Sequence, residues 1–174
     1  MYNVKKNYEF AKNKLYPICR SITGNGINKS LNLIQNKIKN FKIKKIKSNK
    51  KVFNWSIPPE WNIYDAYVED FFGNKIIDFK KNNLHLVGFS VAINKFVTKK
   101  ELLNHIHFIK ELPNAIPYIT SYYKKYWGFC VSYKQYLNIL KTYKENDSFR
   151  VIIKSKHDYK GNLRFGELIL KGKS

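Results

Sequence analysis

The chain of 174 residues has little arginine and few acidic residues. Its only arginines are Arg20, Arg150 and Arg164, so 30 of the 33 basic residues are lysines. With 12 acidic residues, the formal charge is +21, which would attract a polyanion. Arginine rather than lysine suits bidentate recognition of phosphate, so nucleic acid is not the favoured partner. An AT-rich genome would also enrich lysine, asparagine and isoleucine, so the charge alone leaves open whether this surface is selected.

Cysteines and long apolar runs are also scarce. Cys19 and Cys130 lie far apart and outside any CxxC pattern, which argues against a disulfide framework and a structural zinc site. No run of 18 apolar residues occurs, so we expect no transmembrane helix and no signal peptide. The sequence therefore predicts a cytoplasmic protein without a membrane span. Its 44% hydrophobic residues suffice for the core of one domain, or of one domain with a small insertion.

In the first half of the chain, apolar residues recur at helical spacing in some segments and at every second position in others. Apolar residues at helical spacing predict helices over 6–20 and 27–40, and the alternation that follows predicts a strand over 41–48. Pro58 and Pro59 then interrupt the pattern. Beyond them, two alternating runs joined by a Gly-Asn turn predict a β-hairpin over 63–79.

The second half predicts the same mixture of elements. Thr98 with Glu101 forms a capping-box pattern, and Ser132 stands where a second helix would begin. We expect a strand over 84–90, helices over 98–112 and 132–143, and a hairpin made of 149–155 and 163–170. The fold class that follows is α+β, interrupted near Pro58 and again near Asn146.

No catalytic centre or metal site emerges from the reactive residues. His105 and His107 stand two apart on the predicted helix, roughly 200° around it, and cannot share one metal ion. His85, alone on a predicted strand, is expected to be a satisfied structural group. Glu69 and Asp70 should point to opposite faces of a strand, which argues against a paired-carboxylate site. Gly24 and Gly26 do not form a phosphate loop, because the preceding strand and the GK[ST] element are missing. The serines do not stand in the G-x-S-x-G pattern of a nucleophile elbow.

The densest feature is the aromatic stretch IPYITSYYKKYWGFC over residues 116–130. It holds six aromatic side chains, namely Tyr118, Tyr122, Tyr123, Tyr126, Trp127 and Phe129. Such a stretch is typical of a stacking surface or of a partly buried core segment whose tyrosine hydroxyls reach polar partners. The residues alone leave both interpretations open.

Five blocks of sequence carry a family resemblance. They are LYPICRSITGNGINKSL, VFNWSIPPEWNIYDAYV, IIDFKKNNLHLVGFS, LPNAIPYITSYYKKYWGFC and GNLRFGELILKG, and together they extend from about residue 10 to residue 172. In this order they resemble a bacterial aminopeptidase-like family associated with surface polysaccharide biosynthesis. Its members are similar to co-catalytic zinc exopeptidases and carry an inserted domain of unknown function.

The resemblance implies three segments. Residues 1–57 would be the opening helices and first strand of an α/β zinc-exopeptidase domain, and 58–147 the small α+β inserted domain. Residues 148–174 would be a hairpin that re-enters an incomplete, truncated peptidase sheet. Within the inserted domain and at its start, Trp61, Tyr122, Tyr123 and Trp127 are candidates for a pocket wall. The alternative is that they hold the core of that domain together.

The resemblance also implies what this chain lacks. The family's zinc ligands follow the GELIL-like segment, and no position here matches one of them. We therefore expect no zinc in this chain, no catalytic residue and no activity alone, although full-length relatives would bind zinc. The missing C-terminal part is a candidate partner as a separate polypeptide. The competing hypothesis is a free-standing lysine-rich module that binds a polyanion, either an acidic glycan or nucleic acid.

Overall fold

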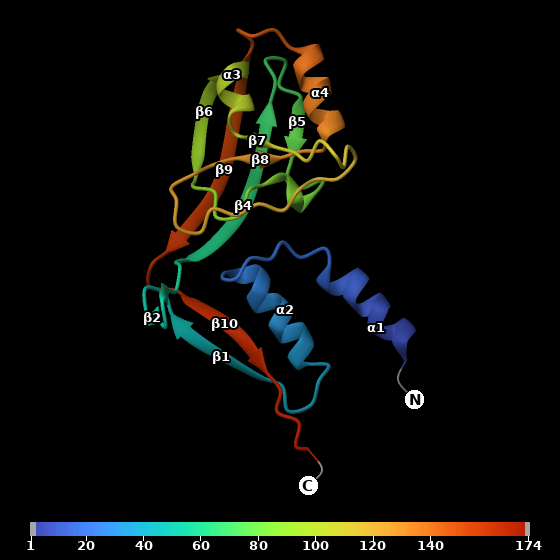
Figure 1. Ribbon diagram of the computed structural model, residues 1–174, viewed down its shortest axis with the longest axis vertical. Helices are drawn as coiled ribbons and strands as arrows, with labels where there is room; N and C mark the ends of the chain where they lie inside the picture. The colour runs from blue at the N-terminus through green and yellow to red at the C-terminus, as the bar shows by residue number, and fades with distance from the viewer. Residues whose placement is uncertain (1–2, 173–174) are drawn as a thin grey trace. The chain divides into compact units, whose positions relative to one another are not determined.

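The structure is a computed structural model that describes residues 3–172 and divides into two compact units (Figure 1). The terminal unit contains the described residues up to Asn62 and those from His157 onward. The central unit contains Ile63–Lys156. Each unit mixes helices and strands, which confirms the α+β class.

The terminal unit is built on a two-stranded ribbon with a helix beside it. Strand β1 pairs antiparallel with β10, and α2 contacts both strands (Figure 1). Its elements are α1 (Val4–Phe10), the π-helix η1 (Ala11–Leu15), α2 (Asn25–Gln35), β1 (Lys42–Lys47), β2 (Lys51–Val52), β3 (Trp55–Ser56) and β10 (Asn162–Glu167). The short strands β2 and β3 pair with each other as a small hairpin.

Local chemistry sets the helix bounds in this unit. The predicted first helix is confirmed only up to Leu15, since the chain leaves the helix before Pro17, whose nitrogen has no hydrogen to donate. The helix α2 begins after Gly24, which has φ 91°. A Cβ there would lie 1.9 Å from the Trp61 carbonyl oxygen, so only glycine fits this close approach. The helix predicted over 27–40 ends at Gln35, while the predicted strand appears as β1.

The central unit is built on a four-stranded sheet in the order β5-β4-β9-β6 (Figure 1). The strands β4 (Glu60–Glu69) and β5 (Lys75–Asp78) form the predicted hairpin, with a register irregularity between Val68 and Glu69. The other elements are η2 (Asn83–His85), β6 (Ile93–Thr98), α3 (Lys99–Leu103), β7 (Ile106–His107), β8 (Phe129–Cys130), α4 (Tyr133–Thr142) and β9 (Ser148–Asp158). In Figure 1, α3 and α4 lie toward the same end of this sheet.

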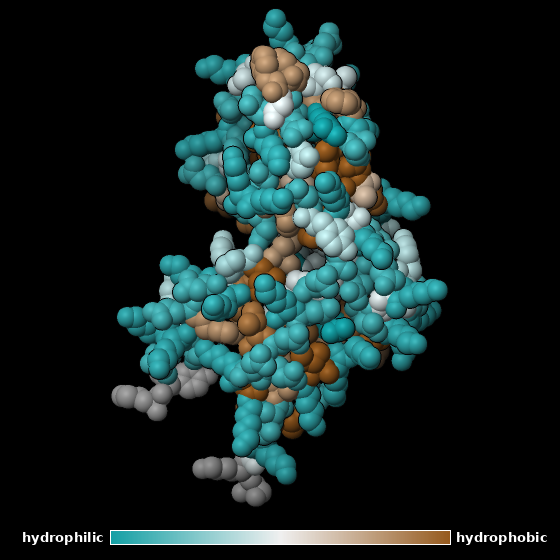
Figure 2. All heavy atoms as spheres, turned by 180° about the vertical axis from the view of Figure 1, so that it is seen from behind, coloured by the Kyte–Doolittle hydropathy of each residue, from teal (hydrophilic) through white to brown (hydrophobic). Residues whose placement is uncertain are grey.

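The apolar core lies in the central unit. Of the 21 buried apolar residues among the described positions, 18 belong to it. Phe89, Phe129 and Phe149 are its largest fully buried side chains. The remaining three buried apolar residues are Leu31, Ile57 and Trp61, in the terminal unit. Figure 2 shows the exterior of one face, where hydrophilic side chains surround smaller hydrophobic patches.

Three sequence predictions are wrong in this region. The helix predicted over 98–112 ends at Leu103, because the next residues pair as β7 with β8 in parallel. The strand predicted over 84–90 is replaced by a 3₁₀ turn and a buried irregular segment in which Phe89 has φ 65°. The last hairpin does not form either, since β9 joins the four-stranded sheet while β10 pairs with β1.

None of the helices in the described part of the chain is both long and apolar enough to cross a membrane.

Candidate functional site

The aromatic stretch is an irregular segment fixed by backbone hydrogen bonds to the buried segment 87–91. Val87 donates to the Gly128 carbonyl at 3.0 Å, and Gly88 donates to the Ile119 carbonyl at 2.8 Å. Val91 donates to the carbonyl of Tyr126 at 2.9 Å. Buried backbone groups need partners, and these bonds supply them where no regular strand exists. The segment is therefore a structural part of the central unit.

The four candidate pocket residues occupy different environments. Trp61 is buried in β4 and belongs to the terminal unit. In the central unit, Tyr122 packs edge-on against Phe89 with ring centroids 4.9 Å apart. Tyr123 is 65% exposed, whereas Trp127 is buried. Tyr123 and Trp127 therefore lie on the same irregular segment, but the first side chain is exposed and the second is buried.

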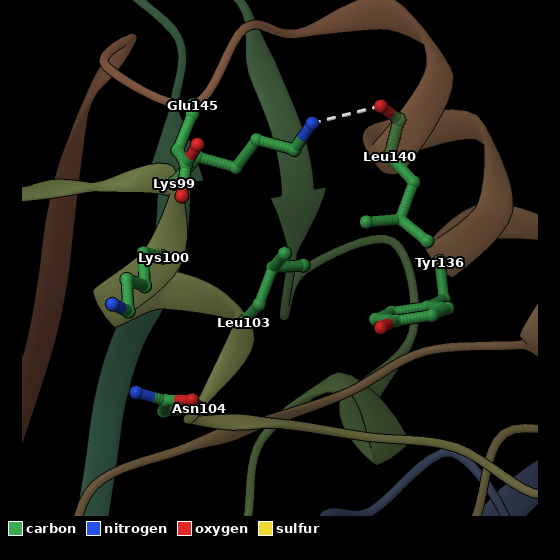
Figure 3. A pocket seen from close by; sticks show the side chains of 7 residues that line it. All are labelled: Lys99, Lys100, Leu103, Asn104, Tyr136, Leu140 and Glu145. Carbon is green, nitrogen blue, oxygen red and sulfur yellow. Dashed lines mark hydrogen bonds between the residues drawn. The ribbon is translucent and has the colours of Figure 1, made fainter.

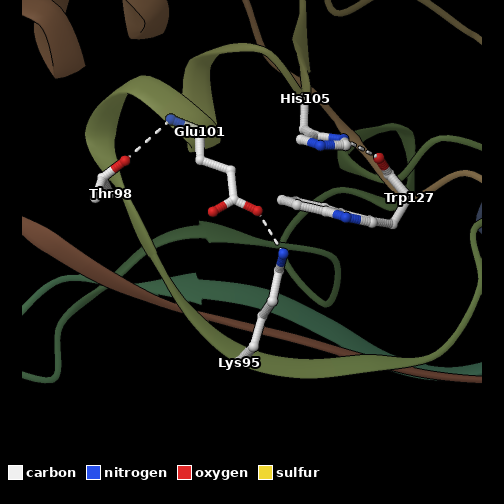
Figure 4. Close-up of polar contacts among 5 residues, drawn as sticks. All are labelled: Lys95, Thr98, Glu101, His105 and Trp127. Atoms are coloured by element: carbon white, nitrogen blue, oxygen red, sulfur yellow. Dashed lines mark hydrogen bonds and ion pairs between the residues drawn. The ribbon is translucent and has the colours of Figure 1, made fainter.

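Trp127 is at the centre of a cluster with two histidines. The His105 ring stacks on its indole at 3.7 Å and 12°, while His105 Nδ1 donates to the Trp127 carbonyl at 2.7 Å (Figure 4). His107 Nε2 lies 2.8 Å from the Tyr126 hydroxyl. Burial, and secondarily the neighbouring His105, lower the pKa of His107. Burial also raises the pKa of Tyr126, so burial favours the neutral form of both side chains in this contact.

An ion pair borders this cluster on its exposed side. Thr98 Oγ1 accepts from the Glu101 backbone nitrogen at 3.2 Å and caps α3, as the sequence predicted (Figure 4). The Glu101 carboxylate pairs with Lys95 Nζ, which lies 5.5 Å from the Trp127 ring centroid. The lysine therefore makes a cation–π contact with the tryptophan while it is paired with the glutamate.

The residues present do not fit a zinc site. Among residues 3–172, no group of three or more His, Cys, Asp or Glu side chains is placed to hold a metal ion. His85 is a satisfied structural group, as predicted, because its Nδ1 donates to the Cys130 carbonyl at 2.7 Å. The Cys130 thiol is itself buried, and burial raises its pKa to about 12. A thiol with that pKa stays protonated at neutral pH and is not a reactive nucleophile.

The Asp70 carboxylate stabilises the turn between β4 and β5. Its carboxylate accepts from the backbone nitrogens of Phe72 and Asn74 at 3.0 and 2.9 Å, and from the Tyr143 hydroxyl at 3.0 Å. Burial would raise the pKa of this carboxyl, but the hydrogen bonds outweigh it and hold the pKa below its usual value. Asp70 lies in the turn after Glu69, the last residue of β4, so the two residues do not alternate on one strand as predicted.

A groove of about 460 Å³ lies between α3 and α4 (Figure 3). Its lining consists of Lys99, Lys100, Leu103, Asn104, Tyr136, Leu140 and Glu145. Lys99 Nζ donates to the Leu140 carbonyl at 2.8 Å and to the Tyr143 carbonyl, which satisfies the end of α4. Tyr136 stacks on Phe108 at 4.1 Å.

The groove includes none of the four candidate pocket residues. Sequence reasoning missed it because its walls come from two helices that only the fold brings together. The available signals were the caps Thr98 and Ser132, which located the two helices but not their contact.

Comparison with known proteins identifies relatives of the whole arrangement. A protein of Clostridium acetobutylicum described as a "Putative polysaccharide biosynthesis protein with aminopeptidase-like domain" is 43% identical over 159 residues. The match covers 91% of this chain and 35% of the relative. The crystal structure of a "putative peptidase" from the same organism superposes with a TM-score of 0.81 at 41% identity, covering 93% of this chain and 37% of that one.

The chain thus spans little more than a third of the length of the relatives that it matches. The first relative confirms the resemblance to an aminopeptidase-like protein associated with polysaccharide biosynthesis, and the solved structure confirms the resemblance to a putative peptidase. Residues 60–156 match a family described as a domain of unknown function, DUF2172, and these residues make up more than half of the chain. The chain therefore belongs to the DUF2172 family.

Proposed function

We propose that this chain is the N-terminal, non-catalytic part of an aminopeptidase-like protein that takes part in surface polysaccharide biosynthesis. The observation that supports this most directly is the 43% identity to the C. acetobutylicum protein over 91% of this chain. That relative is nearly three times as long as the matched region. The activity of the full-length protein is therefore part of what we propose. The family resemblance implies an inserted domain over residues 58–147. We propose that this domain shapes the substrate site.

The chemistry of the described residues supports a non-catalytic role. In a zinc peptidase the metal supplies an activated water and polarises the scissile carbonyl, and a carboxylate base stands beside it. Here the ring nitrogens of His85, His105 and His107 bind carbonyl or hydroxyl oxygens. Each of these contacts uses one ring nitrogen, and among the described residues no three His, Cys, Asp or Glu side chains converge where they could hold a metal ion. We further propose a cytoplasmic location, and a separate polypeptide that supplies the zinc-binding part.

Of the four residues predicted to line a pocket wall, Tyr122, Tyr123 and Trp127 belong to the central unit and remain candidates there, while Trp61 belongs to the terminal unit. The exposure of Tyr123 supports a contact with substrate, and the burial of Trp127 supports a role in packing. Alanine substitutions at both positions in the C. acetobutylicum relative separate these roles. Loss of activity at unchanged stability supports the pocket, whereas a joint loss supports packing.

An exopeptidase assay tests the main proposal. The purified chain, with and without added zinc, is incubated with aminoacyl-p-nitroanilides beside the full-length C. acetobutylicum relative. We expect no release above the blank from the chain alone and no stoichiometric zinc binding in a calorimetric titration. Chelator-sensitive release by the chain would contradict the proposal.

A second candidate is polyanion binding by the terminal unit. This unit holds 18 of the 33 basic residues and 4 of the 12 acidic residues, which gives it a formal charge of +14. Four lysines of β1 are exposed, namely Lys42, Lys44, Lys45 and Lys47. Binding to an acidic polysaccharide should then weaken steeply as salt rises, because counterion release drives such contacts. Absence of binding at low ionic strength would remove this candidate, and equal binding of single-stranded DNA would remove its preference for a glycan.

A further inference from the structure

The groove between α3 and α4 lies within the central unit and combines apolar with polar side chains (Figure 3). Its volume of about 460 Å³ falls in the range of about 300–1,000 Å³ that is typical of small-molecule sites. Three of its lining side chains offer apolar surface and four carry polar ends, namely Leu103, Tyr136 and Leu140 against Lys99, Lys100, Asn104 and Glu145. The groove therefore has room for a small ligand that both packs and makes hydrogen bonds.

Contacts within the central unit hold both walls of the groove in place. Lys99 Nζ reaches from α3 to the Leu140 carbonyl at the end of α4, and it also donates to the Tyr143 carbonyl (Figure 3). On the α4 side, the Tyr136 ring stacks on Phe108 with centroids 4.1 Å apart. A site whose walls are already fixed loses less conformational entropy when a ligand binds.

The other polar side chains of the groove are not used by the protein itself. Within residues 3–172, no hydrogen bond or ion pair engages the side-chain ends of Lys100, Asn104 and Glu145, or the Tyr136 hydroxyl. An ammonium group only donates hydrogen bonds and a carboxylate only accepts them, whereas an amide and a hydroxyl do both. The groove thus offers donors and acceptors together, beside the apolar surface of a ring and two leucines.

This combination of groups discriminates between classes of ligand. An anion such as phosphate would meet the Glu145 carboxylate, while the Lys99 ammonium already has two carbonyl partners. An apolar ligand would take the polar ends out of water without replacing their hydrogen bonds. Peptides commonly add to a strand edge or lay a helix in an apolar groove, but none of the seven lining residues belongs to a strand and only two are aliphatic.

We propose that this groove binds one ring of a neutral sugar. Tyr136 and the two leucines pack against the C–H groups of the sugar, while Asn104 and Glu145 bond its hydroxyls, which both donate and accept. The inference deepens the proposed function, because it names the ligand class for the segment 58–147. It rests on that proposal for the biological role of the site.

A titration of the whole isotope-labelled chain, followed by the NMR signals of its amides, tests the proposal. The probes are N-acetylglucosamine and cellobiose as neutral sugars, with inorganic phosphate and the dipeptide alanyl-alanine as the competing ligand classes. We expect the neutral sugars to shift amides within 99–104 and 133–146, the two sides of the groove. Asn104→Ala and Glu145→Ala should each weaken sugar binding about tenfold, because each removes a hydrogen bond to the ligand.

A matched control separates binding from folding. Asn94→Ala should leave sugar binding unchanged, because Asn94 is also an exposed asparagine but lies on β6, outside the lining of the groove. The side chains of Asn104 and Glu145 are exposed and make no hydrogen bond with another described residue, so both variants should unfold in urea like the parent chain.

Two kinds of result overturn the proposal. Shifts at these amides caused by phosphate or the dipeptide, but not by the sugars, contradict the ligand class. Absence of shifts with every probe, or sugar binding that both groove variants leave unchanged, contradicts the site. Either result leaves the proposed function standing, since that function depends on the exopeptidase assay and not on the groove.

Discussion

The two units are similar in length but differ in how they are stabilised. The central unit, 94 of the 174 residues, holds 18 of the 21 buried apolar residues and has a formal charge of +7. The terminal unit holds three and has a charge of +14. Burial of apolar area is the main favourable term in folding, while like charges oppose compaction. From this comparison we expect the central unit to fold as a domain in its own right and the terminal unit to be the less stable of the two.

Separating the two units is the most direct test of whether the central unit folds on its own. We expect the fragment Glu60–Asp158, which includes both complete central strands β4 and β9, to unfold cooperatively in urea on its own. Amide dispersion in an NMR spectrum provides a second measurement. A fragment that binds a hydrophobic dye and unfolds gradually would show that the central core needs the terminal unit.

A single core truncation should have the next largest effect. Phe129 is fully buried, so Phe129→Ala should lower the free energy of unfolding by about 3–5 kcal/mol through lost apolar burial and a residual cavity. Phe96→Ala is the matched control, since its side chain is 72% exposed and should change stability by about 0.5 kcal/mol or less. Urea unfolding measures both, and equal losses would contradict the location of the core.

The Asp70 turn should have a moderate, pH-dependent effect. Asp70→Asn should cost about 1–3 kcal/mol at pH 7, because an amide cannot accept all the hydrogen bonds of the carboxylate. The folded pKa of Asp70 lies below the ordinary value of 3.8, so its contribution is present above that pH. It is lost as pH falls through the lower folded pKa, while Tyr143, with its pKa raised to about 12 by burial and by Asp70, stays protonated.

Unfolding measured at several pH values between 2 and 7 checks this linkage. The variant should show a shallower loss of stability on the acid side than the parent chain. Parallel curves for the two proteins would mean that Asp70 titrates alike in the folded and unfolded states.

The smallest effects should come from the helix starts, one in each unit. Ser132 and Gln135 form a complete capping box at α4, and Asn62 Oδ1 accepts from the Asn25 backbone nitrogen at 2.7 Å at the start of α2. Ser132→Ala and Asn62→Ala should each cost about 1 kcal/mol. Native-state hydrogen exchange should place the Ser132 loss in the central unit and the Asn62 loss in the terminal unit. Exchange that rises equally in both units would indicate a single cooperative structure.

Much of the local structure was predictable from sequence. The capping residues Thr98 and Ser132 start helices, and the Gly-Asn turn joins β4 and β5, as the patterns predict. These features depend on contacts between residues a few positions apart. The prediction that His105 and His107 cannot share a metal ion rested on a helix that contains both, and that helix ends at Leu103, before either of them.

The failures have a common physical cause. Ile106 fits a helical stripe, but in the fold its strand pairs with Phe129, and that partner is 23 positions away. The β9 and β10 strands follow each other and look like a hairpin, yet each finds its partner elsewhere in the chain. The caps locate the helices α3 and α4, but nothing in the sequence indicates the groove between them, because its walls meet only through packing.

The sequence by itself determined the α+β class, the family resemblance, the helix starts and the excess of lysine, since these depend on composition and on neighbours along the chain. Only the tertiary structure decided where the aromatic stretch would lie, because its hydrogen bonds run to the buried segment 87–91. It also decided that most of the buried apolar residues gather in the central unit. Burial and strand pairing join residues distant in sequence, and only the fold determines which of them meet.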